Sequence, residues 1–172
     1  KNIPMPWFAI ISVTLCISLI QSTLLQHISV LGIQPDLFII FLVYHSLNSK
    51  LDRSLHANWT MGIAKDCFSE GLFGLNTVLF VIVGYMISMI KDNIYGRHLA
   101  TQISVTFIIS IIYNFLYLFM FSISFTSAGL LPMALKCPLI AIYNAIIVPP
   151  VFWLLNRFYS SFGFPSLRRK IR

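Results

Sequence analysis

Charged residues are scarce in this sequence: they make up 10% of its 172 positions, and only five of them are acidic. In a soluble domain about a quarter of all residues are usually charged, so an ordinary soluble fold is excluded. Hydrophobic residues instead make up 58%, and the mean hydropathy is +0.84. So small a chain cannot bury all of this apolar surface by itself. We therefore expect an all-α, polytopic integral membrane protein whose solvent is the bilayer.

Residues for catalysis and metal binding are equally sparse. The three cysteines, Cys16, Cys67 and Cys137, lie far apart without a CxxC spacing, and we interpret them as small buried apolar residues. The four histidines show no metal-ligand spacing, and no phosphate-binding loop or nucleophile–base pattern appears. The sequence therefore predicts a protein that is not an enzyme and that holds no metal ion or other cofactor.

Six segments are candidates for membrane helices. Crossing ~30 Å of hydrocarbon takes about 20 helical residues. Five segments are plainly apolar: residues 7–25, 35–47, 75–90, 103–125 and 133–155. A further segment, residues 54–68, contains several polar side chains, so it needs protein neighbours to cross, and so does the short second segment. The first segment is followed by no small-x-small cleavage pattern, and we expect a retained helix rather than a signal peptide.

The basic residues decide whether residues 54–68 cross the membrane. With six crossings and a cytoplasmic N-terminus, every Lys and Arg except Lys65 and Lys136 falls on the cytoplasmic side. If residues 54–68 did not cross, Lys91, Arg97 and the basic C-terminal stretch would move outside, against the positive-inside rule. We therefore predict six transmembrane helices with both termini in the cytoplasm.

The formal net charge of +7 belongs to these flanking positions and to the C-terminal stretch SLRRKIR. Basic residues at the ends of apolar runs face anionic lipid headgroups, so we expect membrane lipids and not nucleic acid as the partner of this charge. We divide the chain into a six-helix transmembrane domain, residues 1–160, and a basic cytoplasmic tail, residues 161–172.

The stretch AKDCFSEGLFGLN, residues 64–76, concentrates charge and glycine within the apolar sequence. The simplest interpretation is a tight turn at the outer membrane surface. Gly71 ends a helix there in the left-handed conformation, Gly74 completes the turn, and Asn76 is a cap or turn residue of the next helix. Glu70 then marks the water boundary.

Asp66 lies short of that turn, at a depth where an ionisable side chain is costly. It shares a helix face with Trp59 and Gly62, and a glycine lets another helix approach closely. Lys65 is adjacent and points about 100° away, so we expect a backbone donor, Asn76 or another helix as the partner of Asp66. Three roles stay open for this carboxylate: a structural clamp, a contact with a partner or ligand, and proton-coupled chemistry.

The last apolar segment contains proline and asparagine at membrane depth. Pro149 predicts either a structural kink or a bent groove for a partner helix. We take Pro138 to mark the start of this helix. Asn114 and Asn144 are each expected to hydrogen-bond across helices, with a ligand contact as the alternative.

Three stretches of the chain carry a recognisable combination of features. They are PDLFIIFLVY at residues 35–44, GIAKDCFSEGLFGLNTVLFVIVGYMISMIKDNIY at 62–95 and YNAIIVPPVFWLLNRFY at 143–159. A Pro-Asp pair, Pro35 and Asp36, opens the second helix, a Gly–Asp helix runs into a turn ending Gly-Leu-Asn, and the last helix holds Asn and Pro. In this combination the chain resembles the MreD family, the rod-shape-determining inner-membrane proteins of bacteria. It departs from the family at CFSEGLF, residues 67–73, where an apolar, glycine-rich turn without an acid is usual.

The resemblance implies a non-catalytic role in the machinery that elongates rod-shaped cells. It implies a fold similar to the six-helix substrate-binding subunits of vitamin transporters. It also implies a bitopic MreC-like partner and, beside it, the actin-like MreB, the glycan polymerase RodA and a penicillin-binding transpeptidase. We therefore predict an inner-membrane scaffold that binds the membrane helix of the MreC-like protein and supports peptidoglycan elongation and rod cell shape.

A transporter subunit that binds a small, vitamin-type molecule is the alternative function. The two functions require different surfaces. A substrate-binding subunit needs a pocket of several hundred Å³ with converging polar groups, whereas a scaffold needs a groove of apolar and small residues at the level of the lipid.

Overall fold

The computed structural model of the protein describes residues 7–23, 33–69, 72–93, 98–124 and 130–161. In chain order their helices are α1 (Trp7–Thr23), α2 (Leu37–Asn48), α3 (Leu51–Phe68), α4 (Leu75–Ile90), the 3₁₀ helix η1 (Lys91–Asn93), α5 (Leu99–Ser124) and α6 (Leu130–Ser161). The all-α prediction is confirmed for this part of the chain.

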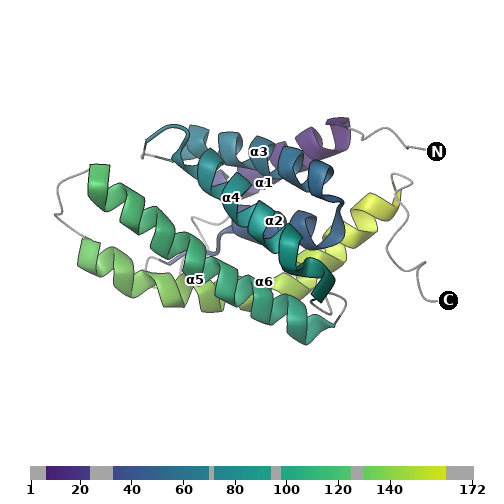
Figure 1. The fold of residues 1–172 in the computed structure, drawn as a ribbon. Coiled ribbons are helices and arrows are strands. Elements are labelled where there is room, and N and C mark those ends of the chain that lie inside the picture. Colours follow the sequence, from purple (N-terminus) through teal and green to yellow (C-terminus); the bar gives the residue numbers. More distant parts are fainter. Residues whose placement is uncertain (1–6, 24–32, 70–71, 94–97, 125–129, 162–172) are drawn as a thin grey trace.

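Helix α2 occupies the centre of the bundle. It packs against each of the other five α-helices, and its side chains from Leu37 to Ser46 are all buried. A helix that is apolar all round lies either among other helices or in lipid, and the burial of these side chains shows that α2 lies among other helices. Helices α1 and α3 lie on one side of it, α5 and α6 form an antiparallel hairpin on the other, and α4 crosses in front (Figure 1).

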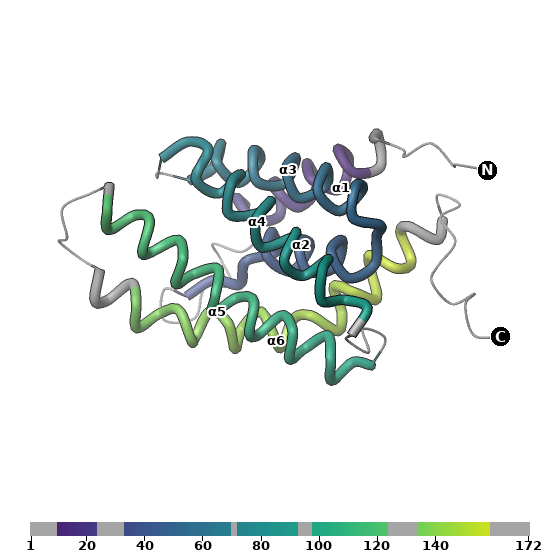
Figure 2. The backbone as a smooth tube through the Cα atoms, in the orientation of Figure 1, coloured from purple at the N-terminus to yellow at the C-terminus, as the bar shows by residue number. Residues whose placement is uncertain are grey.

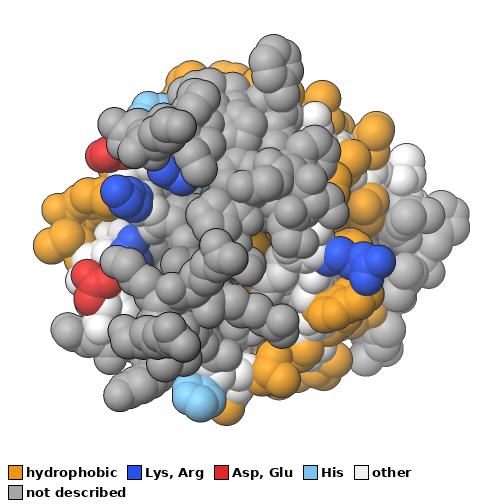
Figure 3. Space-filling view, turned by 90° about the vertical axis from the view of Figure 1, so that its right-hand side faces the viewer, with side chains coloured by type: hydrophobic (Ala, Val, Ile, Leu, Met, Phe, Trp, Pro, Cys, Tyr) orange, Lys and Arg blue, Asp and Glu red, His pale blue; other side chains and the backbone are white. Residues whose placement is uncertain are grey.

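One end of the bundle collects the charged side chains. The start of α1, the α2–α3 junction, η1, the start of α5 and the end of α6 all lie there (Figure 2). We call it the charged end, because its exposed side chains include Lys50, Asp52, Asp92, His98 and Arg157. Figure 3 looks onto this end and shows basic, acidic and histidine side chains, with hydrophobic side chains at the rim. The turn between α3 and α4 lies at the opposite end.

The predicted segments agree with the observed helices except in the last one. The bounds of α4 equal the predicted residues 75–90, and α3 extends the prediction backward to Leu51. The expectation that Pro138 marks the start of the last helix is wrong, because α6 begins at Leu130 and runs through Pro138, Pro149 and Pro150. Pro132 lies in the first turn of this helix, where proline removes no intrahelical hydrogen bond.

Two of the described helices are long and apolar enough to cross a membrane, judged by length and composition. Their spans are Leu99–Ile123 in α5 and Ala134–Phe158 in α6, each of 25 residues. The apolar stretches Ile10–Thr23, Leu37–Asn48 and Leu75–Ile90 are shorter. Six crossings therefore stay a prediction, and so does the division into a membrane domain and a tail, since residues 162–172 lie outside the described ranges.

The prediction that the cysteines are buried is wrong. Cys16 and Cys67 are exposed, Cys137 is half-buried, and none of these three residues forms a disulfide bond. A thiol on an outward face of an apolar helix behaves as a small hydrophobic group, so exposure to lipid carries no penalty. Trp59, expected to share the packed face of α3, is also exposed because it lies at the edge of that face.

Candidate functional site

Asp66, near the end of α3, caps the start of α4. Its side chain is buried, and Oδ1 accepts hydrogen bonds from the backbone N–H and the side-chain Nδ2 of Asn76, both at 3.0 Å. Oδ2 accepts from the backbone N–H of Thr77 at 3.0 Å and from its hydroxyl. The first N–H groups of a helix have no intrahelical acceptor and carry a partial positive charge, which favours a carboxylate there.

These four bonds also limit what Asp66 can do chemically. An ionised carboxylate offers about four acceptor positions, and all of them have a donor within the protein. No acceptor position is left for a substrate proton or a bound cation. Among the three roles considered for Asp66, this geometry favours the structural clamp.

Asn76 connects three helices. Besides its bonds to Asp66, its Nδ2 donates to the hydroxyl of Ser69 at 3.1 Å, and its Oδ1 accepts from the hydroxyl of Tyr113 on α5. The interpretation of Asn76 as a cap is wrong: the N-cap position of α4 is Gly74, and Asn76 lies in the first helical turn. Gly74 has no side chain to cap the helix, so Asp66 does so from α3.

Lys65 forms an ion pair with Asp36, a contact that the sequence did not predict. The pair joins α3 to the start of α2, and each side chain is only 17% exposed. Asp36 is also the N-cap of α2, where its Oδ1 accepts from the backbone N–H groups of Phe38 and Ile39 at 3.1 and 3.3 Å. The Lys65 ammonium lies 4.4 Å from the ring centroid of Tyr113, close enough for a cation–π interaction.

Asn144 brings α6 into the same set of contacts. Its Oδ1 accepts from the backbone N–H of Asp36 at 2.7 Å, and its Nδ2 donates to the hydroxyl of Ser110 at 3.0 Å. Asn144 thus links α6 to α2 and α5, as expected of a hydrogen bond across helices. The same expectation for Asn114 is wrong, because its Nδ2 donates to the carbonyl oxygen of Ser110 on its own helix.

Gln21 extends these contacts to α1. Its Nε2 donates to the carbonyl oxygen of Pro35, and its Oε1 accepts from the N–H of Leu37, both at 3.1 Å. The connected set therefore reaches all six α-helices. We call it the polar hub, and it consists of Gln21, Asp36, Lys65, Asp66, Asn76, Tyr113 and Asn144.

Glycine is required at two of the predicted positions, Gly62 and Gly74, for different structural reasons. A Cβ atom at Gly62 would lie 2.4 Å from the Cα of Thr77, so only glycine allows α3 and α4 to approach this closely. Gly74 has φ +96°, a left-handed conformation that disfavours any side chain. Gly71 and Glu70 lie outside the described residues.

A second polar cluster lies between α2, α3 and α4. Asn58 Nδ2 donates to the hydroxyls of Ser46 at 2.9 Å and Ser54 at 3.2 Å, and the Ser88 hydroxyl donates to that of Ser54 at 3.3 Å. Gly84 leaves the space that Asn58 fills, since a Cβ there would overlap Nδ2. These small polar residues hold three helices together at close range.

Beyond the polar hub, the α5–α6 hairpin exposes its side chains instead of burying them. Residues 118–123 of α5 and 134–140 of α6 contain no buried side chain. We call these two ranges the distal hairpin segment. It exposes large apolar side chains such as Phe119, Ile123 and Leu135. In Figures 1 and 2 this end of the hairpin lies apart from the other helices.

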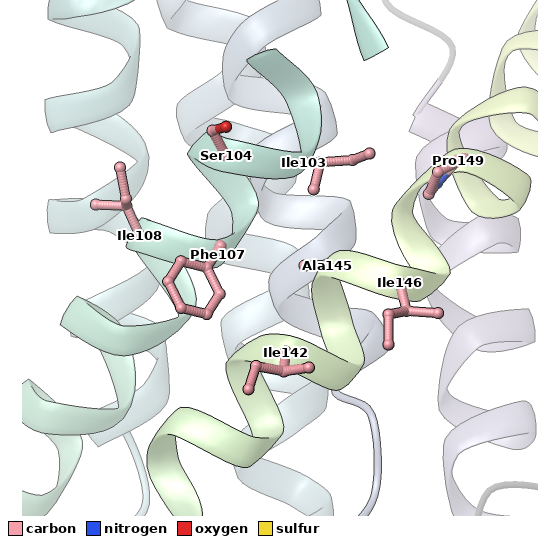
Figure 4. A pocket seen from close by; sticks show the side chains of 8 residues that line it. All are labelled: Ile103, Ser104, Phe107, Ile108, Ile142, Ala145, Ile146 and Pro149. Carbon is pink, nitrogen blue, oxygen red and sulfur yellow. The ribbon is translucent and has the colours of Figure 1, made fainter. Parts of the chain in front are cut away.

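An apolar groove lies between α5 and α6, nearer to the charged end. Its volume is about 660 Å³. Residues from both helices line it, namely Ile103, Ser104, Phe107, Ile108, Ile142, Ala145, Ile146 and Pro149 (Figure 4). The Ser104 hydroxyl is the one polar side-chain group in this lining. Polar groups therefore do not converge on the groove as they do in the site of a polar small molecule.

The family model described as rod shape-determining protein MreD matches residues 1–158. The chain belongs to the MreD family. No curated protein and no solved structure matches the chain. The resemblance based on three stretches of the sequence is thereby confirmed, whereas the likeness to vitamin-transporter subunits stays a prediction.

Membership in the MreD family makes this chain a membrane protein of a shape-determining family that is not known for enzymes. Among the described residues, no group of three or more His, Cys, Asp or Glu side chains is placed to hold a metal ion. The charged side chains within the bundle are instead engaged with one another and with helix ends.

Sequence reasoning found part of the polar hub and missed the rest. Asp36, Asp66, Asn76 and Asn144 were singled out, but Lys65 was considered only as a poor partner of Asp66. A usable signal existed, because Asp36 and Lys65 are opposite charges within segments predicted to cross the membrane, where each needs a partner. Tyr113 carried no such signal, since a tyrosine on a long apolar helix is ordinary.

Proposed function

We propose that this member of the MreD family is a non-catalytic scaffold in the bacterial inner membrane. Its six α-helices cross the bilayer, and both termini lie in the cytoplasm. It binds the single membrane helix of a bitopic MreC-like partner. Through that partner it supports peptidoglycan elongation together with MreB, RodA and a penicillin-binding transpeptidase.

The position of the charged end supports the proposed topology. The helix ends there carry most of the described exposed charged side chains, including Lys50, Arg157 and Asp92, and the α3–α4 turn lies at the other end. The polar helix α3 crosses the bilayer because α1, α2 and α4 pack against it and because Lys65 and Asp66 are neutralised by Asp36 and by the start of α4.

The hydrogen bonding of the buried polar side chains supports a scaffold rather than a transporter subunit. The hub side chains bond to one another and to helix backbones, so none is presented to a solute. The groove between α5 and α6 is large enough for a small molecule, yet its lining is almost entirely apolar.

The distal hairpin segment is the observation that carries the proposed partner site. Phe119 is 52% exposed, and the preceding Phe115 is also exposed. The stacked rings of Tyr113, Tyr117 and Phe121, whose centroids are 6.5 and 6.2 Å apart, lead from the hub into this segment along α5. Membrane helices associate by van der Waals packing, and a single partner helix can cover a face that this chain leaves open.

Site-specific photo-crosslinking in living cells tests this site. A photoreactive phenylalanine analogue at Phe119 is expected to capture the MreC-like protein. The matched control is the same analogue at Leu15 on α1, which is 59% exposed and belongs to a helix that packs on α2 and α3. Capture of the partner from Leu15 and not from Phe119 would move the partner site to the opposite face and contradict the proposal.

A further inference from the structure

The α6 face that lines the groove continues to the charged end as a row of residues that are exposed, apart from the half-buried Pro149. Ile142, Ile146, Pro149, Trp153 and Arg157 follow one another at spacings of three or four, so they lie on one side of the helix. Trp153 is 63% exposed. The row therefore passes from an apolar groove to an aromatic side chain and then to a positive charge.

The far end of this row is suited to a phosphate group. The Arg157 guanidinium carbon lies 5.8 Å from the ring centroid of Trp153, a cation–π distance. Tryptophan is enriched where the hydrocarbon meets the headgroups, and arginine presents a planar set of donors that fits phosphate oxygens. From Pro149 to Arg157 the helix rises by about 12 Å, so the guanidinium lies at the polar boundary when the groove lies in hydrocarbon.

The dimensions of the groove favour a lipid chain over a partner helix. Its lining spans only residues 103–108 and 142–149, which is at most about 12 Å along either helix. A transmembrane helix packs over much of the ~30 Å hydrocarbon thickness. A volume of about 660 Å³ with an apolar wall instead falls in the range of small-ligand sites.

We propose that the groove between α5 and α6 binds an acyl chain of an anionic phospholipid whose phosphate group is held by Arg157. Trp153 packs between the phosphate and the groove, at the level of the glycerol backbone. The site lies on the same hairpin as the distal segment, but it uses other residues and requires no protein partner. Its failure and the failure of the partner site are therefore separate results.

Fluorescence quenching by brominated lipids tests the proposal on the full chain in vesicles. Replacing Trp7 and Trp59 by Phe leaves Trp153 as the single reporter. Brominated phosphatidylglycerol, added as a minor component to phosphatidylcholine vesicles, is expected to quench Trp153 about fivefold more strongly per mole than brominated phosphatidylcholine, since one basic residue contributes that much preference. Equal quenching by the two lipids overturns the proposal.

Two pairs of variants separate the headgroup contact from the groove. Arg157→Gln is expected to abolish the preference for phosphatidylglycerol, while Lys136→Gln, an exposed lysine near the other end of α6, leaves it unchanged. Ser104→Phe fills the groove and is expected to weaken quenching by both lipids. Its control is Ser122→Phe, a change of another exposed serine on α5 outside the groove.

The same variants define the results that contradict the proposal. If Arg157→Gln removes the preference for phosphatidylglycerol but Ser104→Phe does not change the quenching, the phosphate group binds without an acyl chain in the groove, which contradicts the proposal. If both serine variants act alike, the groove has no special role. A photoreactive residue at Ser104 that captures a protein instead of phospholipid shows that the occupant is a partner or a second copy, which also overturns the lipid assignment.

Discussion

Helices α3 and α5 differ in their number of charged residues and in how these helices are covered by their neighbours. Helix α3 carries four charged residues within 18 positions, Asp52, Arg53, Lys65 and Asp66. Helix α5 carries none within 26. The inner charges of α3 are paired within the bundle, whereas α5 leaves much of its length exposed. A polar helix is stable in lipid only behind its neighbours, and an apolar helix is free to face lipid or a partner.

This difference suggests that one set of residues determines the folding stability of the protein and another set determines what it binds. The polar hub around α3 joins six helices, so we expect substitutions there to act mainly on folding. The hairpin presents the distal segment and the groove, so substitutions on its outer faces should act mainly on what binds there. Three predictions test this separation, in order of decreasing expected effect.

Asp66→Ala should produce the largest loss of stability. It leaves the N–H groups of Asn76 and Thr77 and two side-chain donors without their acceptor, and we expect the free energy of unfolding to fall by about 3 kcal/mol or more. Thermal melting of the purified full chain in detergent measures this. Phe119→Ala on the hairpin should change stability by less than about 0.5 kcal/mol. Equal losses in the two variants would contradict the separation.

The ion pair between Lys65 and Asp36 should show strong coupling. Lys65→Met and Asp36→Asn each leave one charge unpaired at membrane depth, and asparagine still caps α2. We expect the double variant to lose about 1–2 kcal/mol less than the sum of the single losses. A double-mutant cycle on unfolding free energy measures the coupling. Lys50→Met, at the exposed start of α3, is the control, and additive losses would show that the pair contributes nothing as a pair.

Gly74→Val should have the smallest of the three effects. No atom lies within 4 Å of a Cβ built at this position, so the cost comes from the left-handed backbone alone and is about 1–2 kcal/mol. Gly74→Asn should cost less, since asparagine tolerates this conformation. Melting temperatures of both variants provide the measurement. Equal losses for valine and asparagine would mean that the turn does not depend on the backbone angle.

The helices were predictable because their signals are local. The length of its apolar run identified α4 with its bounds, and the positions of the basic residues along the chain favoured a helix at α3 in spite of its polar side chains. Pro138 misled the prediction for α6, since a helix within a bundle accepts interior proline more readily than a sequence rule allows. The contact between Asp66 and Asn76 could be predicted from the sequence, because only ten positions and one turn separate the two residues.

By itself, the sequence determined that this chain is a helical membrane protein, because apolar runs and flanking charges act through composition and spacing alone, and its match to a family model placed it in the MreD family. Only the tertiary structure decided that Lys65 pairs with Asp36, that Asn144 reaches the start of α2, and that α5 and α6 leave a groove. These contacts join segments up to 108 residues apart, and such pairing depends on how helices pack in space, which no local pattern along the chain records.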